Sequence, residues 1–192
     1  MKSSAILLIA ASLLSGRAVS AQEARAPSRI EIGGVAGYVT ADGADFNGTD
    51  AAFGWGGGVR YVLLGRVGLG AGIHYSDHGL QSFPEHLHIR AVYGEARYFV
   101  QLGGAPVTAF GGLRFGWVHE DITIVNWTAK GSVAGGLVGL DWRFASPLAL
   151  ELQISETAIR LGDRRAANGS VMSGTAVRGS ALGLQGGLLI TF

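Results

Sequence analysis

The last segment of the chain reads Leu182-Gly183-Leu184-Gln185-Gly186-Gly187-Leu188-Leu189-Ile190-Thr191-Phe192. Residues two apart in a β-strand point to the same face of the sheet. One face of this segment is apolar and carries Leu182, Leu184, Gly186, Leu188, Ile190 and Phe192. The opposite face carries Gly183, Gln185, Gly187 and Thr191. The segment therefore predicts a strand with one face suited to hydrocarbon and one suited to polar surroundings.

Similar alternation recurs through the rest of the chain. It defines eight segments at about 30–39, 53–62, 67–76, 88–100, 107–117, 132–144, 148–157 and 175–192. The joints Leu63 to Arg66, Gln101 to Pro106 and Ala145 to Pro147 are short, whereas long connections are expected at about 40–52, 77–87, 118–131 and 158–174. Short turns at one end and long loops at the other are typical of outer-membrane barrels. We predict an all-β, eight-stranded antiparallel up-and-down transmembrane β-barrel with both termini in the periplasm.

The N-terminal segment has the pattern of a secretory signal peptide. Met1-Lys2 gives a positive start, Ala5 to Leu14 an apolar run, and Val19-Ser20-Ala21 the small residues expected before a cleaved bond. The apolar run is shorter than the roughly 20 residues of a membrane-spanning helix. We therefore expect a cleaved signal peptide over 1–21 and a single barrel domain over 22–192.

Composition narrows the possible functions. Without Lys2 and Arg17 of the leader, 13 of the 15 basic residues remain against 14 acidic ones, so charge gives no argument for binding nucleic acid. The chain has no cysteine, which excludes disulfides and thiol catalysis. Charged residues make up 15% of the chain, against roughly 25% in soluble domains, so few are present to coat a water-exposed surface.

Alternation alone also fits a soluble barrel, such as a lipocalin, whose apolar face lines a cavity. The low charge content, the final phenylalanine and the clustering of aromatic residues at segment ends favour the inverted, membrane arrangement. These aromatic residues are Tyr38, Phe53, Tyr61, Tyr75, Tyr98, Trp117, Trp142 and Phe192. We therefore expect apolar side chains to face lipid and polar ones to face the barrel axis.

The leader, the eight segments, Tyr93-Gly94-Glu95-Ala96-Arg97-Tyr98 and Phe192 together resemble the small OmpA-type outer-membrane β-barrel family. The resemblance covers the whole mature chain. It implies a location in the outer membrane of a Gram-negative-type bacterium and recognition of the last strand, including Phe192, by the barrel-assembly machinery. Outer-membrane lipids and lipopolysaccharide are expected partners, the barrel is expected to be a monomer, and no cofactor is expected. Family members range from structural anchors to adhesins and rare enzymes, so the fold leaves function open.

The predicted polar faces carry an equal number of positive and negative side chains. The inward set is Glu31, Arg60, Glu95, Arg97, Arg114, Asp141, Arg143 and Glu151. Eight strands leave a lumen that side chains fill, and the long charged residues of the sixth and seventh segments are expected to reach toward glycine-rich walls across it. Pairing offsets the cost of burying charge, so we interpret the set as a plug and keep a narrow ion channel as the alternative. The expected role is structural or one of surface interaction.

Two further constellations lie near the long-loop end. His74-Tyr75-Ser76 resembles the His-x-Ser element of outer-membrane lipid A deacylases, where His is the base for a Ser nucleophile, and Glu85 is the candidate orienting acid. That family carries the element in its next-to-last strand, whereas here it lies in the third. His78, His86 and His88 are candidate metal ligands, although their spacing matches no strong motif.

The fourth long connection offers a third candidate, because guanidinium groups bind phosphate in bidentate fashion. Its arginines, together with Arg178 on the following strand, are candidates to bind lipopolysaccharide phosphates, with ordinary solubility as the alternative. The connection carries Arg160, Arg164 and Arg165.

Overall fold

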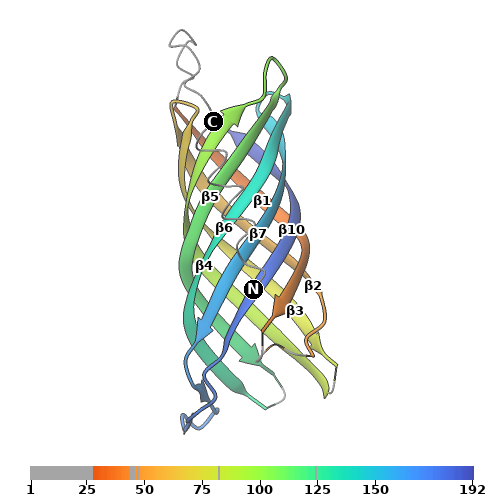
Figure 1. The fold of residues 1–192 in the computed structure, drawn as a ribbon, viewed down its shortest axis with the longest axis vertical. Helices are drawn as coiled ribbons and strands as arrows, with labels where there is room; N and C mark the ends of the chain where they lie inside the picture. Colours follow the sequence, from red (N-terminus) through yellow and green to blue (C-terminus); the bar gives the residue numbers. More distant parts are fainter. Residues whose placement is uncertain (1–27, 44–45, 47, 82, 124) are drawn as a thin grey trace.

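Figure 1 shows the chain as a computed structural model that describes residues 28–192 except 44–45, 47, 82 and 124. The expected signal peptide lies outside these described residues. Eight long strands form the wall: β1 (Arg29–Asp42), β2 (Ala52–Leu63), β3 (Val67–Leu80), β4 (Phe83–Gln101), β5 (Val107–Ile122), β6 (Trp127–Ala145), β7 (Leu148–Leu161) and β10 (Arg178–Thr191). The two-residue strands β8 (Arg164–Arg165) and β9 (Val171–Met172) lie between β7 and β10. No helix in the described part of the chain is long and apolar enough to cross a membrane.

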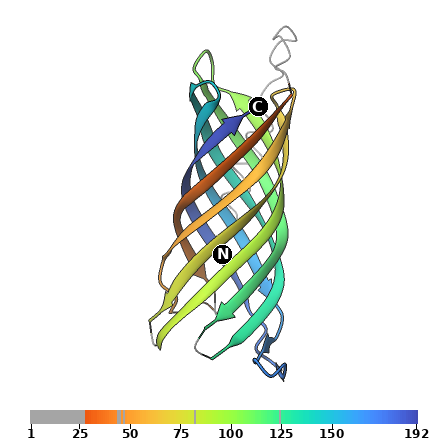
Figure 2. The ribbon, with the colours of Figure 1, turned by 180° about the vertical axis from the view of Figure 1, so that it is seen from behind.

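The long strands close into a barrel. Each pairs antiparallel with its two neighbours, and the ring includes β1 with β10 and β5 with β6. Figures 1 and 2 show this closed cylinder from opposite sides. Following register partners once around the ring from Lys130 returns to Leu140 on the same strand, a stagger of ten residues that tilts the strands. The predicted eight-stranded antiparallel barrel is confirmed.

Two of the four connections that the sequence indicated as long are instead hairpins. β3 ends at Leu80 and β4 begins at Phe83, while β5 ends at Ile122 and β6 begins at Trp127. The prediction of loops over 77–87 and 118–131 was wrong because the strands continue beyond the apolar outer surface. Their inward residues there pack into a core, which comprises Phe46, Leu87, Ile89, Val118, Ile122, Ala129, Val133, Ile159, Leu161 and Val177.

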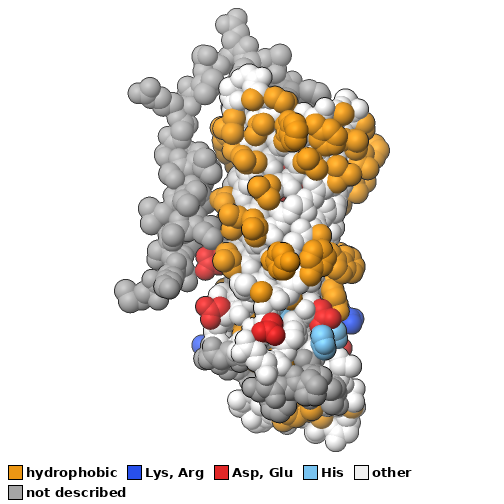
Figure 3. Space-filling view, turned by 90° about the vertical axis from the view of Figure 1, so that its right-hand side faces the viewer, with side chains coloured by type: hydrophobic (Ala, Val, Ile, Leu, Met, Phe, Trp, Pro, Cys, Tyr) orange, Lys and Arg blue, Asp and Glu red, His pale blue; other side chains and the backbone are white. Residues whose placement is uncertain are grey.

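The outer surface is apolar over the part of the barrel that contains the first residues of β1 and the last residues of β10. Figure 3 shows this belt of hydrophobic side chains, with acidic, basic and histidine side chains gathered beyond it toward the long-loop end. Outward aromatic residues lie at its edge, and the side chains of Trp117 and Phe115 are 75% and 66% exposed. In a soluble lipocalin-like barrel these residues would line a cavity. That alternative is therefore wrong, and the apolar face points outward as predicted.

Candidate functional site

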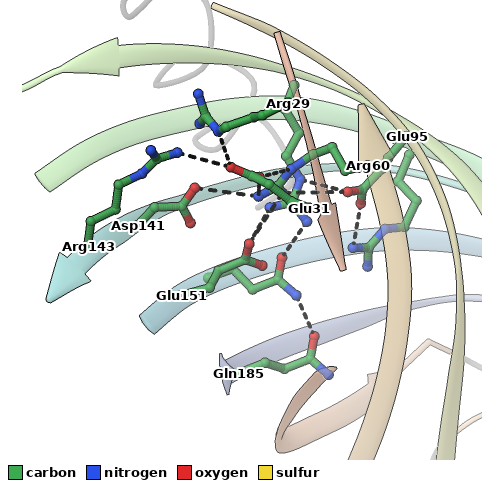
Figure 4. A network of polar contacts seen from close by, with 11 residues as sticks. Arg29, Glu31, Arg60, Glu95, Asp141, Arg143, Glu151 and Gln185 are labelled. Carbon is green, nitrogen blue, oxygen red and sulfur yellow. Dashed lines mark hydrogen bonds and ion pairs between the residues drawn. The ribbon is translucent and has the colours of Figure 1, made fainter. Parts of the chain in front are cut away.

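The lumen at the level of the belt is crossed by a network of charged side chains centred on Arg60 (Figure 4). Its guanidinium donates to Glu31 Oε2 from Nε at 2.8 Å and from Nη2 at 2.6 Å. It also reaches Glu151 Oε2 at 3.3 Å and Asp141 Oδ2 at 3.5 Å. Arg60 on β2 thus pairs with carboxylates from the neighbouring strand β1 and from β6 and β7 on the far side of the ring.

Arg97 extends the network toward β5. Its Nη1 donates to Glu151 Oε2 at 2.7 Å, and its Nε lies 2.8 Å from Glu95 Oε1. Glu95 also accepts from Arg114 Nη2 at 3.0 Å through its second oxygen. Glu151 binds both Arg60 and Arg97, and Glu95 Oε1 lies 4.0 Å from Arg60 Nη1, so these two carboxylates join the two halves of the network.

The remaining predicted member is Arg143, whose Nη2 donates to Glu31 Oε1 at 3.2 Å. The structure therefore brings all eight residues of the inward set into one network. Burial decides its energetic character: Glu31 and Glu151 are only 2% and 3% exposed. Unpaired charges at such positions would cost several kcal/mol each, so the network stands only because its arginines and carboxylates face each other.

Aromatic rings also lie against the guanidinium groups of the network, in addition to the carboxylates. The Arg114 guanidinium carbon lies 3.9 Å from the centre of the Tyr93 ring, and that of Arg97 lies 4.5 Å from Phe110. Phe99 and Phe110 belong to an apolar cluster with Val62 and Leu137, all nearly fully buried. This cluster packs beside the network, with the Phe99 and Phe110 rings against Arg60 and Arg97.

Glycines make room for the network, in a different way from the one predicted. A Cβ at Gly68 would lie 2.9 Å from Arg60 Cδ and 2.8 Å from Phe99 Cε2. Gly68 thus accommodates a side chain from the neighbouring strand β2. The glycines of β2 and β3 were expected to face Asp141 and Glu151 from across the lumen. Side chains from neighbouring strands lie nearer to them, namely Arg60 at Gly68 and Gly70 and Tyr93 at Gly72.

Sequence reasoning missed two parts of this site. Arg29 donates from Nε to Glu31 Oε1 at 2.6 Å, although the first strand was expected to begin after it. Arg29 and Glu31 are two residues apart and therefore share a strand face, and this spacing was the signal that Arg29 points inward. Gln153 Nε2 donates to Gln185 Oε1 at 3.0 Å and extends the polar layer to β10. The pairing of β7 with β10, which closes the ring, is what brings these two amides together.

Above the network lies a small cavity of about 60 Å³. Its lining includes His74, Ser76, Tyr93, Arg114 and Gln185. A volume of this size holds only a few water molecules. Beyond it, the core of the long-loop half fills the barrel with apolar side chains. Toward the long loops the lumen thus contains first the charged network with its adjoining apolar cluster, then the small cavity, and then the apolar core.

The candidate catalytic residues are arranged differently from the prediction. Ser76 Oγ lies 3.0 Å from Nε2 of His78, and His78 Nδ1 lies 3.0 Å from the carbonyl oxygen of Asp50. The carbonyl requires a proton on Nδ1, so Nε2 accepts from the Ser76 hydroxyl. The predicted base, His74, instead contacts the side chain of Gln185 at 3.4 Å. Glu85 belongs to β4, but its side chain lies outside the described part of the structure.

The Ser76 hydroxyl also faces the wrong way for an enzyme that acts on lipid. Ser76 is 1% exposed and lines the inner cavity, whereas lipid A would contact the outer face of the wall. Burial holds the pKa of His78 below its usual range, against the hydrogen bond to Asp50, which acts to raise it. A neutral His78 accepts a hydrogen bond from Ser76 inside the barrel. Through the Asp50 carbonyl, it also links the first loop to β3.

The three candidate metal ligands do not share a site. His78 points into the barrel, whereas His86 and His88 lie on its outer face. There His86 Nδ1 is 2.9 Å from Asp77 Oδ1, and His88 Nδ1 is 2.9 Å from the Tyr75 hydroxyl. In the described residues, no three histidine, aspartate or glutamate side chains are arranged to hold a metal ion. The prediction failed because residues 78 and 86 fall on opposite faces of the wall.

Comparison with known families now adds to the geometry. A family model described as the outer membrane protein beta-barrel domain matches residues 7–184. The chain belongs to this family. As a member of the outer membrane protein beta-barrel family, it is an integral protein of the outer membrane, and its apolar belt faces the lipid. The predicted location and the resemblance are confirmed.

Solved structures with the same fold come from several bacteria. Neisserial surface protein A (NspA) is 12% identical, with a TM-score of 0.70, over 87% of this chain and 100% of its own. Ail of Yersinia pestis, in complex with the heparin analogue sucrose octasulfate, is 12% identical with a TM-score of 0.53, over 86% and 97%. OprG of Pseudomonas aeruginosa is 15% identical with a TM-score of 0.52, over 90% and 99%. At such identities the likeness of this outer-membrane barrel to them is one of fold. None of the curated proteins compared with the chain matches it.

Proposed function

We propose that this protein is a non-conducting outer-membrane barrel that works through its outer and extracellular surfaces, in a structural or surface-interaction role. The observation that carries the proposal is the network around Arg60 and Glu151, which ties β2, β4 and β7 together across the lumen. An ion pathway would need mobile water along the axis. Here the polar layer is internally paired, the apolar cluster around Phe99 and Phe110 packs beside it, and an apolar core fills the lumen on its long-loop side.

The layered lumen supports this role over that of a channel. The ion pairs lie between rings that hold the guanidinium groups, so opening a path would require paired charges to separate inside the barrel. The long strands on the loop side extend the molecule beyond the membrane and give it a rigid surface there. A rigid extracellular surface on a closed anchor is suited to contacts with lipids or other molecules.

Planar-bilayer recording tests the proposal. The purified barrel, inserted into a bilayer in potassium chloride, is expected to give no steady conductance, while a wide porin in the same chamber confirms that the assay detects insertion. The expected result is unchanged in Arg97→Gln, because the apolar cluster of Phe99 and Phe110 and the apolar core on the long-loop side remain in place. Steady conductance of the wild type that is abolished by changing Glu95 or Arg97 would establish a channel and overturn the proposal.

A further inference from the structure

We propose that the small cavity above the network binds a monovalent anion of the halide class, held by Arg114. The inference goes beyond the proposed function, because it assigns a ligand to the interior of the barrel. The cavity has a volume of about 60 Å³, and the described residues that line it include Arg114 but no aspartate or glutamate. A positive charge therefore sets the electrostatic character of the cavity.

The Arg114 guanidinium is only partly satisfied by the protein. Arg114 is 8% exposed, and its Nη2 donates to Glu95 Oε2 at 3.0 Å. Its Nε is also buried but has no hydrogen-bond partner among the described residues. Glu95 is shared with Arg97, whose Nε lies 2.8 Å from Oε1. A buried donor without an acceptor is costly, above all in a charged group, so Arg114 favours an acceptor inside the cavity.

The described network also contains one more positive than negative group. It comprises five arginines and four carboxylates, namely Arg29, Arg60, Arg97, Arg114 and Arg143 with Glu31, Glu95, Asp141 and Glu151. Arg29 and Arg143 lie at the end of the network away from Gln185 (Figure 4), and the Arg143 side chain is 42% exposed there. Arg114 and Gln185 line the cavity at the other end. A monovalent anion beside the buried Arg114 balances the excess charge.

The rest of the lining suits a halide. Ser155 and Thr157 bring hydroxyl groups that can donate to an anion, and Val118, Val133 and Ile159 form an apolar part of the wall. A chloride ion is similar in size to a water molecule, so it fits a space that holds a few waters. Phosphate and sulfate carry more charge and need more donors. Water alone would satisfy the Arg114 Nε but would leave the excess charge unbalanced.

Bromide, a heavier halide, makes the site visible by crystallography. The barrel is unfolded in urea and folded into detergent in sodium bromide, so that the ion can enter however slowly it exchanges, and is then crystallised. Anomalous diffraction at the bromine absorption edge is expected to show a peak in the cavity beside Arg114 Nε. A cavity that holds water alone, without an anomalous peak, overturns the proposal.

Stability gives a second measurement. Urea titrations are carried out at constant ionic strength while sodium bromide replaces sodium fluoride, whose anion is more strongly hydrated. A ligand that binds only the folded state stabilises it by mass action, so each tenfold rise in bromide above the dissociation constant should lower the unfolding equilibrium constant about tenfold. A bromide peak in the crystal without this dependence would show an ion that contributes nothing to the fold, and would also overturn the proposal.

Variants identify the residues that hold the ion. Arg114→Gln is expected to abolish the dependence on bromide, and Thr157→Val, which keeps the charge but removes a hydroxyl, to move it to higher concentrations. Arg66→Gln is the matched control and should respond as wild type does, because Arg66 is an exposed arginine in the turn at the opposite end of the barrel. Thr157→Val tests the site even if Arg114→Gln does not fold.

A dependence on bromide that neither Arg114→Gln nor Thr157→Val alters overturns the site. Each of these failures would leave a non-conducting barrel intact, so the bilayer recordings separate this inference from the proposed function.

Discussion

At the scale of single residues, the charged network depends on Glu151. One of its oxygens accepts from Arg97 at 2.7 Å and from Arg60 at 3.3 Å, and the residue is almost wholly buried. Removing its charge leaves two buried guanidinium groups with too few carboxylates. The cost of such a deletion exceeds the net contribution of the pair, because the surviving charges remain out of water.

We expect Glu151→Gln to lower the free energy of unfolding by about 3–5 kcal/mol, measured by urea titration of the barrel in lipid vesicles. Glu156→Gln is the matched control on the same strand, because Glu156 faces outward and belongs to no ion pair of the network. It should change the free energy by less than about 1 kcal/mol. Equal effects of the two substitutions would show that the network contributes little.

Residue parity explains how much of this site was predictable. A strand period of two assigns each charged residue to a face. Seven members of the inward set are buried inside the barrel, and Arg143, whose side chain is 42% exposed, pairs with the buried Glu31. Parity does not give the height of a residue along the axis, which depends on register. The pairing of Ser76 with His78 rather than His74 therefore could not be read from the sequence, since all three side chains share the inner face.

At the scale of elements, the first loop is joined to β3 through His78. The imidazole contacts the Asp50 carbonyl and the Ser76 hydroxyl, and the Asp50 amide donates to the Gly79 carbonyl at 2.9 Å. Burial depresses the pKa of His78 in the folded state. The unfolded chain, with a histidine pKa of about 6.5, therefore takes up the proton first as the pH falls.

The stability contributed by neutral His78 should be present above about pH 6.5 and lost as the pH falls toward the lowered folded-state pKa. The slope from this one group is at most about 1.4 kcal/mol per pH unit. His78→Gln keeps a donor and an acceptor but cannot titrate, so its free energy of unfolding should depend less on pH between 7 and 5.

Ser76→Ala serves as the control, because it removes the hydroxyl and keeps the titrating ring. Urea titrations of the three proteins across this range supply the measurement. Parallel curves for wild type and His78→Gln would contradict the assignment.

The hairpins show where element prediction fails. The β3–β4 and β5–β6 connections contain enough polar residues, such as Asp77 and Asp121, to suggest loops. Their inner positions nevertheless carry Leu87, Ile89 and Val118, which pack together beyond the belt. The outer face there meets water, so polar residues replace the apolar stripe that had marked a strand. The segment boundaries predicted from that stripe therefore stop at the membrane edge, although the strands do not.

At the scale of the whole molecule, the belt leads to a prediction that distinguishes a surface in contact with lipid from one in contact with water. Leu152 lies on the outer face of β7 within the belt and is 53% exposed, while Val171 in β9, beyond the wall of the barrel, is 50% exposed. Leu152→Lys should cost about 2–4 kcal/mol of unfolding free energy in vesicles, because a lysine near the bilayer midplane loses hydration.

Val171→Lys should change the same quantity by less than about 0.5 kcal/mol, because its surroundings are aqueous. The two residues are matched in exposure, so any difference reports the solvent that surrounds each. A loss for Leu152→Lys no greater than that for Val171→Lys would mean that the belt does not lie in hydrocarbon.

The two halves of the barrel are filled by side chains of opposite character, yet the strands pass from one half to the other without a change in their alternation. Ionic pairs occupy the axis where hydrocarbon lies outside, and aliphatic residues occupy it where water lies outside. Nothing in the backbone has to mark this seam, since β6 keeps the same alternation from Trp127 to Arg143. The distal portion is therefore a head built on the same continuous strand pairing as the embedded portion, although the two are filled by side chains of opposite character.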